Sequence, residues 1–542
     1  MNSLMKKAIA TVAAAATALG LAAATGAAAN AAGEKATLTV STADAKFAGK
    51  TVNAYKMFDA SVTGSGSSKV VTYKLDTRWK TFFTTTTTTE GTSGATDCSD
   101  NDALDQCASD YVKGLKDTAL DTFAQKASNW AQKNGIAAVA SAPKISETAT
   151  DSKYTAKFTG LDYGYYVVAV PGASVVNANG KYASLVSVHE AEAEQTIKGE
   201  LPTVTKKVDG DKDATDAKVG QQLTFTLKST IPDMSAYDSY TFDFNDTLSE
   251  GLTFDAIDSV KVEGVDAALV ENTDYTVTKP TADNGNKLTV SMTNFKTKQQ
   301  ANAGKAITVT YKATLNKYAV VAGEGNTNSA SVYYTTNPEN TEFGDSQPST
   351  VRTYTYGFTI DKYTGTYGDN AKRLDGAKFQ LQDAKGTEIQ VVQESAGSDT
   401  AAAVYRVATT GETAATEIAT PKSGKLTFKG LANGNYLLEE TDAPTDYNKL
   451  ANKIGIKIEG DNGEGNPAKA TVAVTYDNNA GNDGYTESAE TDAEGQKTII
   501  PVKNESGVTL PGTGGMGTVA FTVVGVLIVA FGVAWALRRK RA

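Results

Sequence analysis

The chain has 542 residues, with 62 acidic against 52 basic side chains, one histidine and two cysteines. This acidic balance disfavours nucleic-acid binding, because affinity for a phosphate backbone depends on lysine and arginine. A secreted enzyme is also disfavoured, because no Ser/His/Asp or Cys/His set is present and His189 has no partner visible in the sequence. Short alternating segments rich in tyrosine, threonine and valine are instead typical of an all-β, multidomain extracellular protein.

The N-terminus has the pattern of a secretory signal peptide. Lys6 and Lys7 precede an alanine-rich apolar run over residues 8–24, and residues 29–31 are small, as at a cleavage site. We therefore assign residues 1–31 to a signal peptide. This segment and the C-terminal one described below hold six basic and no acidic residues, so 46 basic and 62 acidic side chains remain. The resulting net charge of about −16 suits a soluble surface protein.

Residues 32–198 form the first predicted domain, a set of strands with one helical insertion. Alternation predicts strands at 36–40, 51–55, 154–158, 165–170 and 184–188. Between residues 103 and 134, apolar residues recur at spacings of three and four, which predicts a helix with one apolar face. Packing of this helix on the sheet is favoured over a role in binding a partner. Residues 191–202 are predicted to be a polar connector.

Cys98 and Cys107 are the two cysteines of a chain that carries a secretion signal. Such a pair predicts one small disulfide-closed loop. A metal site there is disfavoured, because no histidine or second cysteine pair is near. Residues 209–213 resemble a calcium loop but lack the glycine and terminal glutamate of an EF-hand, which favours a polar turn. We expect no metal and no cofactor.

Two further β domains are predicted, over residues 199–350 and 351–506. The middle domain has predicted strands at 203–208, 222–227, 240–246, 287–292, 306–315 and 329–334. The third has predicted strands at 358–362, 378–381, 425–428, 436–441, 454–458, 471–476 and 498–502. Seven short strands separated by turns rich in Gly, Asn and Asp predict an immunoglobulin-like sandwich.

Strand alternation in the third domain points three polar side chains into the core. Lys362, Glu440 and Asn504 each share a strand face with apolar neighbours. Burial of an unpaired charge is costly, so these groups are expected to meet. Burial lowers the pKa of a lysine and raises that of a carboxylic acid. A neutral amine can then attack the asparagine amide, assisted by the protonated acid, to form an isopeptide bond. A buried ion pair without a covalent bond is the alternative.

The segment from Tyr436 to Tyr447 resembles the pilin E-box, with Asp446 where glycine is usual. The resemblance implies that Glu440 is the catalytic acid of a Lys362–Asn504 bond. Residues 374–379 also resemble the strand that follows the reactive lysine in the CnaB-type domains of these pilins.

The middle domain repeats the pattern with Lys206, Asp246 and Asn328 on inward strand faces. Segments 205–208, 246–252 and 328–333 are similar to pieces of pilin middle domains. The resemblance implies a Lys206–Asn328 bond with Asp246 as the acid. Lys207 is the rival for Lys206, but alternation disfavours it. An ordinary sandwich with surface polar residues is the alternative, and no comparable trio is evident in the first domain.

The C-terminal segment, residues 507–542, contains a pentapeptide, an apolar run and a basic tail. The pentapeptide is Leu510, Pro511, Gly512, Thr513 and Gly514. The 20 uncharged residues 518–537 can cross a hydrocarbon core as a helix, and the basic cluster 538–541 favours a cytoplasmic end. An ordinary membrane anchor would have these last two features.

The order of the three elements resembles the LPxTG cell-wall sorting signal. The resemblance implies that a sortase cleaves the Thr513–Gly514 bond and joins Thr513 to an amine. In shaft pilins that amine belongs to a lysine between the first two domains, in a Tyr-Pro-Lys-like motif. This chain lacks the motif but has Lys198 at the corresponding place. Lys181, Lys206 and Lys207 remain alternatives, and Lys198 could be an ordinary solvated linker residue.

The resemblance covers nearly the whole chain and implies tandem immunoglobulin-like sandwiches of the CnaA and CnaB types. It identifies a major (shaft) fimbrial subunit of the isopeptide-forming LPxTG pilins of Gram-positive bacteria. The implied partners are sortase, other copies of the chain and peptidoglycan, with minor pilins and host ligands as further candidates. Such a subunit is not an enzyme, lies in a fimbria on the cell wall and supports adhesion. The alternative is a monomeric wall-anchored adhesin, or a minor or basal pilin that binds a host ligand.

Overall fold

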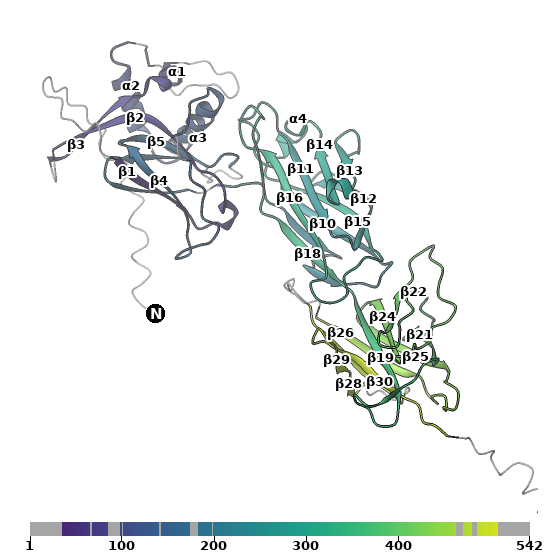
Figure 1. The fold of residues 1–542 in the computed structure, drawn as a ribbon. Coiled ribbons are helices and arrows are strands. Elements are labelled where there is room, and N and C mark those ends of the chain that lie inside the picture. Colours follow the sequence, from purple (N-terminus) through teal and green to yellow (C-terminus); the bar gives the residue numbers. More distant parts are fainter. Residues whose placement is uncertain are drawn as a thin grey trace, which may run out of the picture.

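The computed structural model describes residues 35–64, 68–84, 98–99, 101–139, 142–173, 183–197, 199–461, 470–479 and 485–507. Three modules of strands lie in a row: β1–β7, β8–β18 and β19–β30 (Figure 1). The prediction of a mainly β chain with a helical insertion is confirmed. The predicted signal peptide, Lys181, Lys198 and the sorting signal from Leu510 onward lie outside the described residues. No helix within the described ranges is long and apolar enough to span a membrane.

The first module has two sheets. One has the order β4 (Tyr154–Asp162), β1 (Lys35–Thr42) and β7 (Glu192–Thr196); the other has the order β3 (Val70–Leu75), β2 (Asn53–Thr63), β5 (Gly164–Ala169) and β6 (Ala183–Val188). β7 lies in the segment predicted to be a connector, so that prediction is wrong in part. Four of its five side chains are polar and none is fully buried, and the strand is held by parallel backbone pairing with β1, which leaves little apolar signal.

The helical insertion consists of separate helices rather than one continuous helix. These are α1 (Lys80–Thr84), α2 (Leu104–Gly114) and α3 (Asp117–Lys133), preceded by a 3₁₀ turn at Thr77–Trp79. A further 3₁₀ turn, Ala45–Phe47, lies between β1 and β2. Leu115 and Lys116 have extended backbone angles and separate α2 from α3. Glycine at position 114 favours a break because it has low helix propensity. α2 packs on β3, and α3 packs on β5 and β6, as expected for a helix that covers a sheet.

The middle module is a sandwich of two sheets. The first has the order β12 (Leu252–Val262), β15 (Ala306–Leu315), β10 (Gln222–Thr230) and β8 (Thr205–Val208). The second has the order β13 (Tyr275–Thr278), β14 (Lys287–Met292), β11 (Phe242–Leu248), β16 (Asn326–Thr335), β18 (Ser349–Tyr354) and β9 (Ala214–Asp216), with β17 (Phe343–Asp345) on β16. Short helical turns lie at α4 (Phe295–Gln299), Ala282–Asn284 and Gln300–Asn302.

The limits of the middle module follow from its strand pairing. β18 pairs with β16, so the sheet continues to Tyr354, past the predicted domain boundary at residue 350. Along β15 every second residue is buried, which is the alternation expected of a strand with one face on the core. Tyr311 belongs to this inward face.

The third module is one continuous ladder. Its main order is β21 (Lys378–Asp383), β25 (Gly434–Asp442), β26 (Ile454–Gly460), β27 (Val472–Asp477), β30 (Lys497–Lys503), β19 (Tyr356–Thr364), β24 (Lys425–Leu431), β23 (Ala403–Val407) and β22 (Val391–Ser395). Three short strands pair at its sides: β20 (Lys372–Arg373), β28 (Glu487–Ser488) and β29 (Glu490–Thr491). All seven predicted strands are present. The first long strand, β19, runs parallel to the last, β30.

Backbone contacts join the middle and third modules. The Val219 N–H donates to the Gly430 carbonyl at 2.9 Å, and the Asn433 N–H donates to Asp216 Oδ2 at 2.8 Å. Gly430 has φ +84°, and a Cβ there would lie 2.9 Å from Val219 Cγ2. Glycine is therefore required by both backbone conformation and close approach.

Candidate functional site

The three polar residues predicted to meet in the third module lie together in its core. Lys362 Nζ donates a hydrogen bond to Asn504 Oδ1 and lies 2.9 Å from Glu440 Oε1. Asn504 Nδ2 donates to the same Glu440 oxygen at 3.0 Å. The three residues are at most 1% exposed. One carboxylate oxygen thus touches both the amine and the amide nitrogen.

The strands explain how distant parts of the chain meet at this site. Lys362 on β19 is opposite Val502 on β30, and Asn504 follows two residues later on the same face. β19 and β25 are not neighbours in the ladder, so the contact with Glu440 shows that the ladder curves around a shared core. The Leu450 N–H donates to Glu440 Oε2 at 2.7 Å and fixes the orientation of the carboxylate.

The electrostatics of the third-module site favour a reactive amine. Burial lowers the pKa of Lys362, and the charge and hydrogen bond of Glu440 oppose this shift. A neutral amine has a free lone pair, so burial increases the fraction of lysine that can act as a nucleophile.

The middle module brings Lys206, Asp246 and Asn328 into one buried cluster from three strands, β8, β11 and β16. Lys206 Nζ donates to Asp246 Oδ2, and burial lowers the pKa of Lys206 to about 8. Lys207, the rival lysine, points outward and pairs with Asp213 at 2.9 Å. Strand alternation therefore selects the inward lysine correctly.

A fourth residue of this cluster, Tyr311, was not predicted. Its hydroxyl lies 3.0 Å from Lys206 Nζ, 2.7 Å from Asp246 Oδ2 and 2.6 Å from Asn328 Nδ2. The predicted strand over 306–315 does place this ring on the inward face. A buried tyrosine hydroxyl requires a polar partner, and that requirement is the one sequence signal that could have indicated its role.

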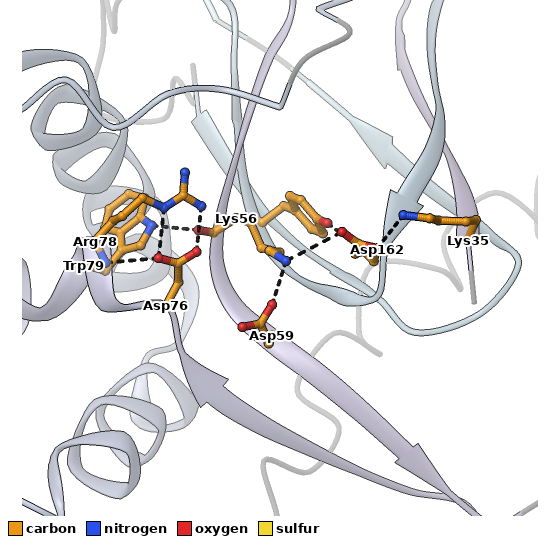
Figure 2. A network of polar contacts seen from close by, with 8 residues as sticks. Lys35, Lys56, Asp59, Asp76, Arg78, Trp79 and Asp162 are labelled. Carbon is orange, nitrogen blue, oxygen red and sulfur yellow. Dashed lines mark hydrogen bonds and ion pairs between the residues drawn. The ribbon is translucent and has the colours of Figure 1, made fainter. Parts of the chain in front are cut away.

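The first module has no buried lysine among its described residues. Its charged groups form a surface network instead (Figure 2). Lys56 Nζ lies 2.6 Å from Asp59 Oδ1, and Lys35 Nζ lies 2.6 Å from Asp162 Oδ1. Both carboxylate side chains are more than half exposed. The exposed carboxylates distinguish these ion pairs from the two fully buried clusters.

The two cysteines and the single histidine, which the sequence also singled out, each have a partner in the structure. Cys98 and Cys107 form a disulfide with a Cα–Cα distance of 5.8 Å. His189 does have a partner, because its Nδ1 lies 2.7 Å from Ser187 Oγ, two residues earlier on the chain. Burial lowers the pKa of His189, which keeps the ring neutral near pH 7. Among the described residues, no group of three or more His, Cys, Asp or Glu side chains is arranged to hold a metal ion.

Comparisons with known families match three segments of the chain. Residues 219–338 match the Gram-positive pilin backbone subunit 2, Cna-B-like domain; residues 362–473 match a prealbumin-like fold domain; residues 502–542 match the LPXTG cell wall anchor motif. These matches define a cell-wall-anchored surface protein with pilin modules. In these segments the chain is similar to the backbone pilins of Gram-positive bacteria. It is a structural subunit and a substrate of sortase, not an enzyme.

Individual relatives include the trypsin-resistant surface T6 protein of Streptococcus pyogenes serotype M6. It is 27% identical over 391 residues, which cover 63% of this chain and 70% of that protein. The solved T6 backbone pilin is 18% identical, with a TM-score of 0.43 over 79% of this chain and 82% of that one. The full-length major pilin SpaD of Corynebacterium diphtheriae is 18% identical, with a TM-score of 0.38 over 88% of this chain and 98% of that one.

Proposed function

We propose that this backbone pilin forms two internal isopeptide bonds, Lys362–Asn504 in the third module and Lys206–Asn328 in the middle module. The observation that carries the proposal is the convergence of Lys362, Glu440 and Asn504 in a fully buried site. Glu440 and Asp246 are the assisting acids. Each bond would stabilise a module under tension, as a structural subunit of a fibre requires.

The proposed reaction needs no cofactor. The neutral lysine Nζ attacks the asparagine Cγ, and the protonated acid beside the amine assists the transfer of protons. A proton passes from Nζ to the amide nitrogen, the Cγ–Nδ2 bond breaks, and ammonia leaves. The acid ends the reaction with the proton with which it began. Each bond therefore lowers the mass of the chain by one ammonia molecule.

The proposed polymer joins Thr513 of one subunit to Lys198 of the next, after cleavage of the Thr513–Gly514 bond. In the sequence, Lys198 falls between the end of β7 and the start of β8, the last strand of the first module and the first strand of the middle one. Lys206 is 1% exposed, and this burial disfavours it as the acceptor. The last subunit is joined to peptidoglycan. Binding of minor pilins and adhesion to host surfaces complete the proposed role.

Mass spectrometry tests the internal bonds. The mature chain is expected to be lighter than its calculated mass by two ammonia molecules, beyond the loss of hydrogen on disulfide formation. Lys362→Ala and Lys206→Ala should each restore one ammonia, whereas Lys207→Ala, which changes the adjacent outward lysine, should restore none. A mature chain that retains both ammonia masses would refute both bonds.

A further inference from the structure

The hydroxyl of Tyr311 occupies the centre of the middle-module cluster. It accepts hydrogen bonds from Lys206 Nζ at 3.0 Å and Asn328 Nδ2 at 2.6 Å, and it donates to Asp246 Oδ2 at 2.7 Å. In the proposed reaction these three groups are the nucleophile, the leaving group and the acid. No other hydroxyl makes a hydrogen bond to any of these side chains among the described contacts of the module.

The two sites differ in how the leaving nitrogen is reached. In the third module, Glu440 Oε1 contacts Lys362 Nζ at 2.9 Å and Asn504 Nδ2 at 3.0 Å, so the acid alone connects the two nitrogens. In the middle module the acid is Asp246, one methylene shorter, and the atom that contacts Asn328 Nδ2 is the Tyr311 oxygen. The tyrosine therefore occupies the bridging position that the longer acid fills in the other module.

Packing holds the tyrosine in this position. Its ring stacks on Phe225 with centroids 5.3 Å apart and contacts Phe254 at 5.9 Å. Lys206 Nζ lies 5.1 Å from the ring centroids of both Tyr311 and Phe225. Burial raises the pKa of Tyr311 well above 10, and the nearby Asp246 charge adds to the shift. The side chain is therefore a neutral hydroxyl that can donate and accept at once.

We propose that Tyr311 is a catalytic residue that relays a proton from Lys206 to the departing nitrogen of Asn328. The inference rests on the proposed isopeptide bond of the middle module. As the Nζ–Cγ bond forms, Nζ gives one proton to the Tyr311 oxygen, and the hydroxyl gives its own proton to Nδ2. The Cγ–Nδ2 bond then breaks, ammonia leaves, and Tyr311 again holds one proton.

The direction of the contact with Asn328 reverses during this step. An amide nitrogen donates to the tyrosine oxygen, because its lone pair is delocalised into the carbonyl group. Attack at Cγ ends this delocalisation, and the nitrogen becomes an amine that accepts a proton. The hydroxyl lies within hydrogen-bond distance of this atom before the reaction, as a general acid must.

The test is a time course of crosslinking in newly synthesised, full mature chain. Intact mass and peptide mapping follow the Lys206–Asn328 and Lys362–Asn504 bonds separately. Tyr311→Phe removes one oxygen and keeps the ring. The middle bond is expected to form about 10²-fold more slowly, the lower end of the range for general acid–base catalysis. The third-module bond should form at the wild-type rate and serves as the internal reference.

Tyr240→Phe is the matched control, because Tyr240 is a buried tyrosine of the same module outside the cluster. It should crosslink at the wild-type rate. If Tyr311→Phe matches the wild type, the relay is refuted while the proposed bond stands. If the wild type itself lacks the Lys206–Asn328 bond, the proposed function fails for this module.

A second variant tests the relay even if the Tyr311→Phe chain does not fold. A fluorotyrosine at position 311 keeps the hydroxyl and its contacts but makes the phenol more acidic. A relay through this hydroxyl predicts a changed rate for the middle bond and an unchanged rate for the third-module bond. An unchanged middle rate in a folded fluorotyrosine chain would overturn the proposal.

Discussion

Lys206 is a buried amine that would lose its ability to titrate on joining Asn328. Burial lowers its pKa from 10.5 to about 8, with Asp246 opposing the shift. A lysine of the unfolded chain titrates near about 10.4. Between these two pKa values the unfolded chain binds more protons than the folded chain. The free energy of unfolding of a chain with free Lys206 therefore rises with pH across this window.

An uncrosslinked variant can reveal this dependence. Asn328→Ala keeps Lys206 as a free amine, and its free energy of unfolding is expected to rise by about 2 kcal/mol between pH ~8 and pH ~10. The reference is the triple variant Lys206→Met, Asp246→Asn, Asn328→Ala, in which neither partner titrates. Denaturant unfolding at a series of pH values measures the difference. Parallel curves for the two variants would show that Lys206 is not desolvated.

The residues of the two trios could be predicted because alternation and the cost of a buried charge act together. Lys362, Glu440 and Asn504 each interrupt an apolar strand face, and such interruptions are visible in the sequence. Tyr311 could not be selected in this way, because its ring fits the apolar pattern of β15. The contacts of the Tyr311 hydroxyl become visible only when β15 is packed against the sheet that carries Asp246 and Asn328.

At the scale of elements, β18 lies in the part of the chain that connects the two proposed bonds. About 27 residues separate Asn328 from the start of β19, and β18 is the strand within them that pairs alongside Asn328. Its register runs from Asn326 opposite Thr353 to Ala330 opposite Ser349. Tension that passes through a Lys206–Asn328 bond would then act on β18, which leads to the third module. It would pull β18 along its own direction, against the backbone hydrogen bonds that pair β18 with β16.

Stretching single molecules tests this expectation. When the mature chain is pulled by its ends, the middle module should release about 27 residues, roughly 90 Å at ~3.4 Å per residue. The third module should release almost nothing, because Lys362 and Asn504 lie near its two ends. Lys206→Ala should instead release the whole middle module. A wild-type middle module that extends completely would contradict the proposed bond.

The elements that were not predicted from the sequence were missed for related physical reasons. β7 and β18 are held by backbone pairing beside other strands, and Ala193 is the one apolar residue of β7. The break between α2 and α3 falls at Leu115 and Lys116, where the helical spacing of apolar residues continues across a local change of backbone angle. Periodicity predicts which residues face a core, but it does not report where a backbone turns or pairs.

At the scale of the molecule, the modules and the sorting signal could be predicted from the sequence, but the junctions between modules could not. The contact of Val219 with Gly430 joins the segment between β9 and β10 to the distant strand β24, and such a contact has no periodic signature. The row of modules in Figure 1 places the segment between β7 and β8 at one boundary and the end of β30 at the far tip. The proposed polymer would join the far tip of one subunit to the boundary between the first two modules of the next.

Polymerisation provides the corresponding prediction. Cells with the cognate sortase should produce a ladder of very large, SDS-resistant species, and Lys198→Ala should abolish it because the acceptor amine is lost. Lys207→Ala is the control, since that lysine is paired with Asp213 on the middle module. Gel electrophoresis of cell-wall extracts measures the result. A ladder that persists in Lys198→Ala would move the acceptor to another lysine, such as Lys181.

The adjacency of β19 and β30 also has a consequence for the unfolded chain. Lys362 and Asn504 are 142 positions apart, so a bond between them closes almost the whole third module into a ring. By the loop-entropy relation for crosslinks, this closure raises the free energy of the unfolded chain by about 5 kcal/mol. That amount is comparable with the entire stability of many domains, about 5–15 kcal/mol. A third module that loses its structure would therefore begin refolding with its first and last strands already joined.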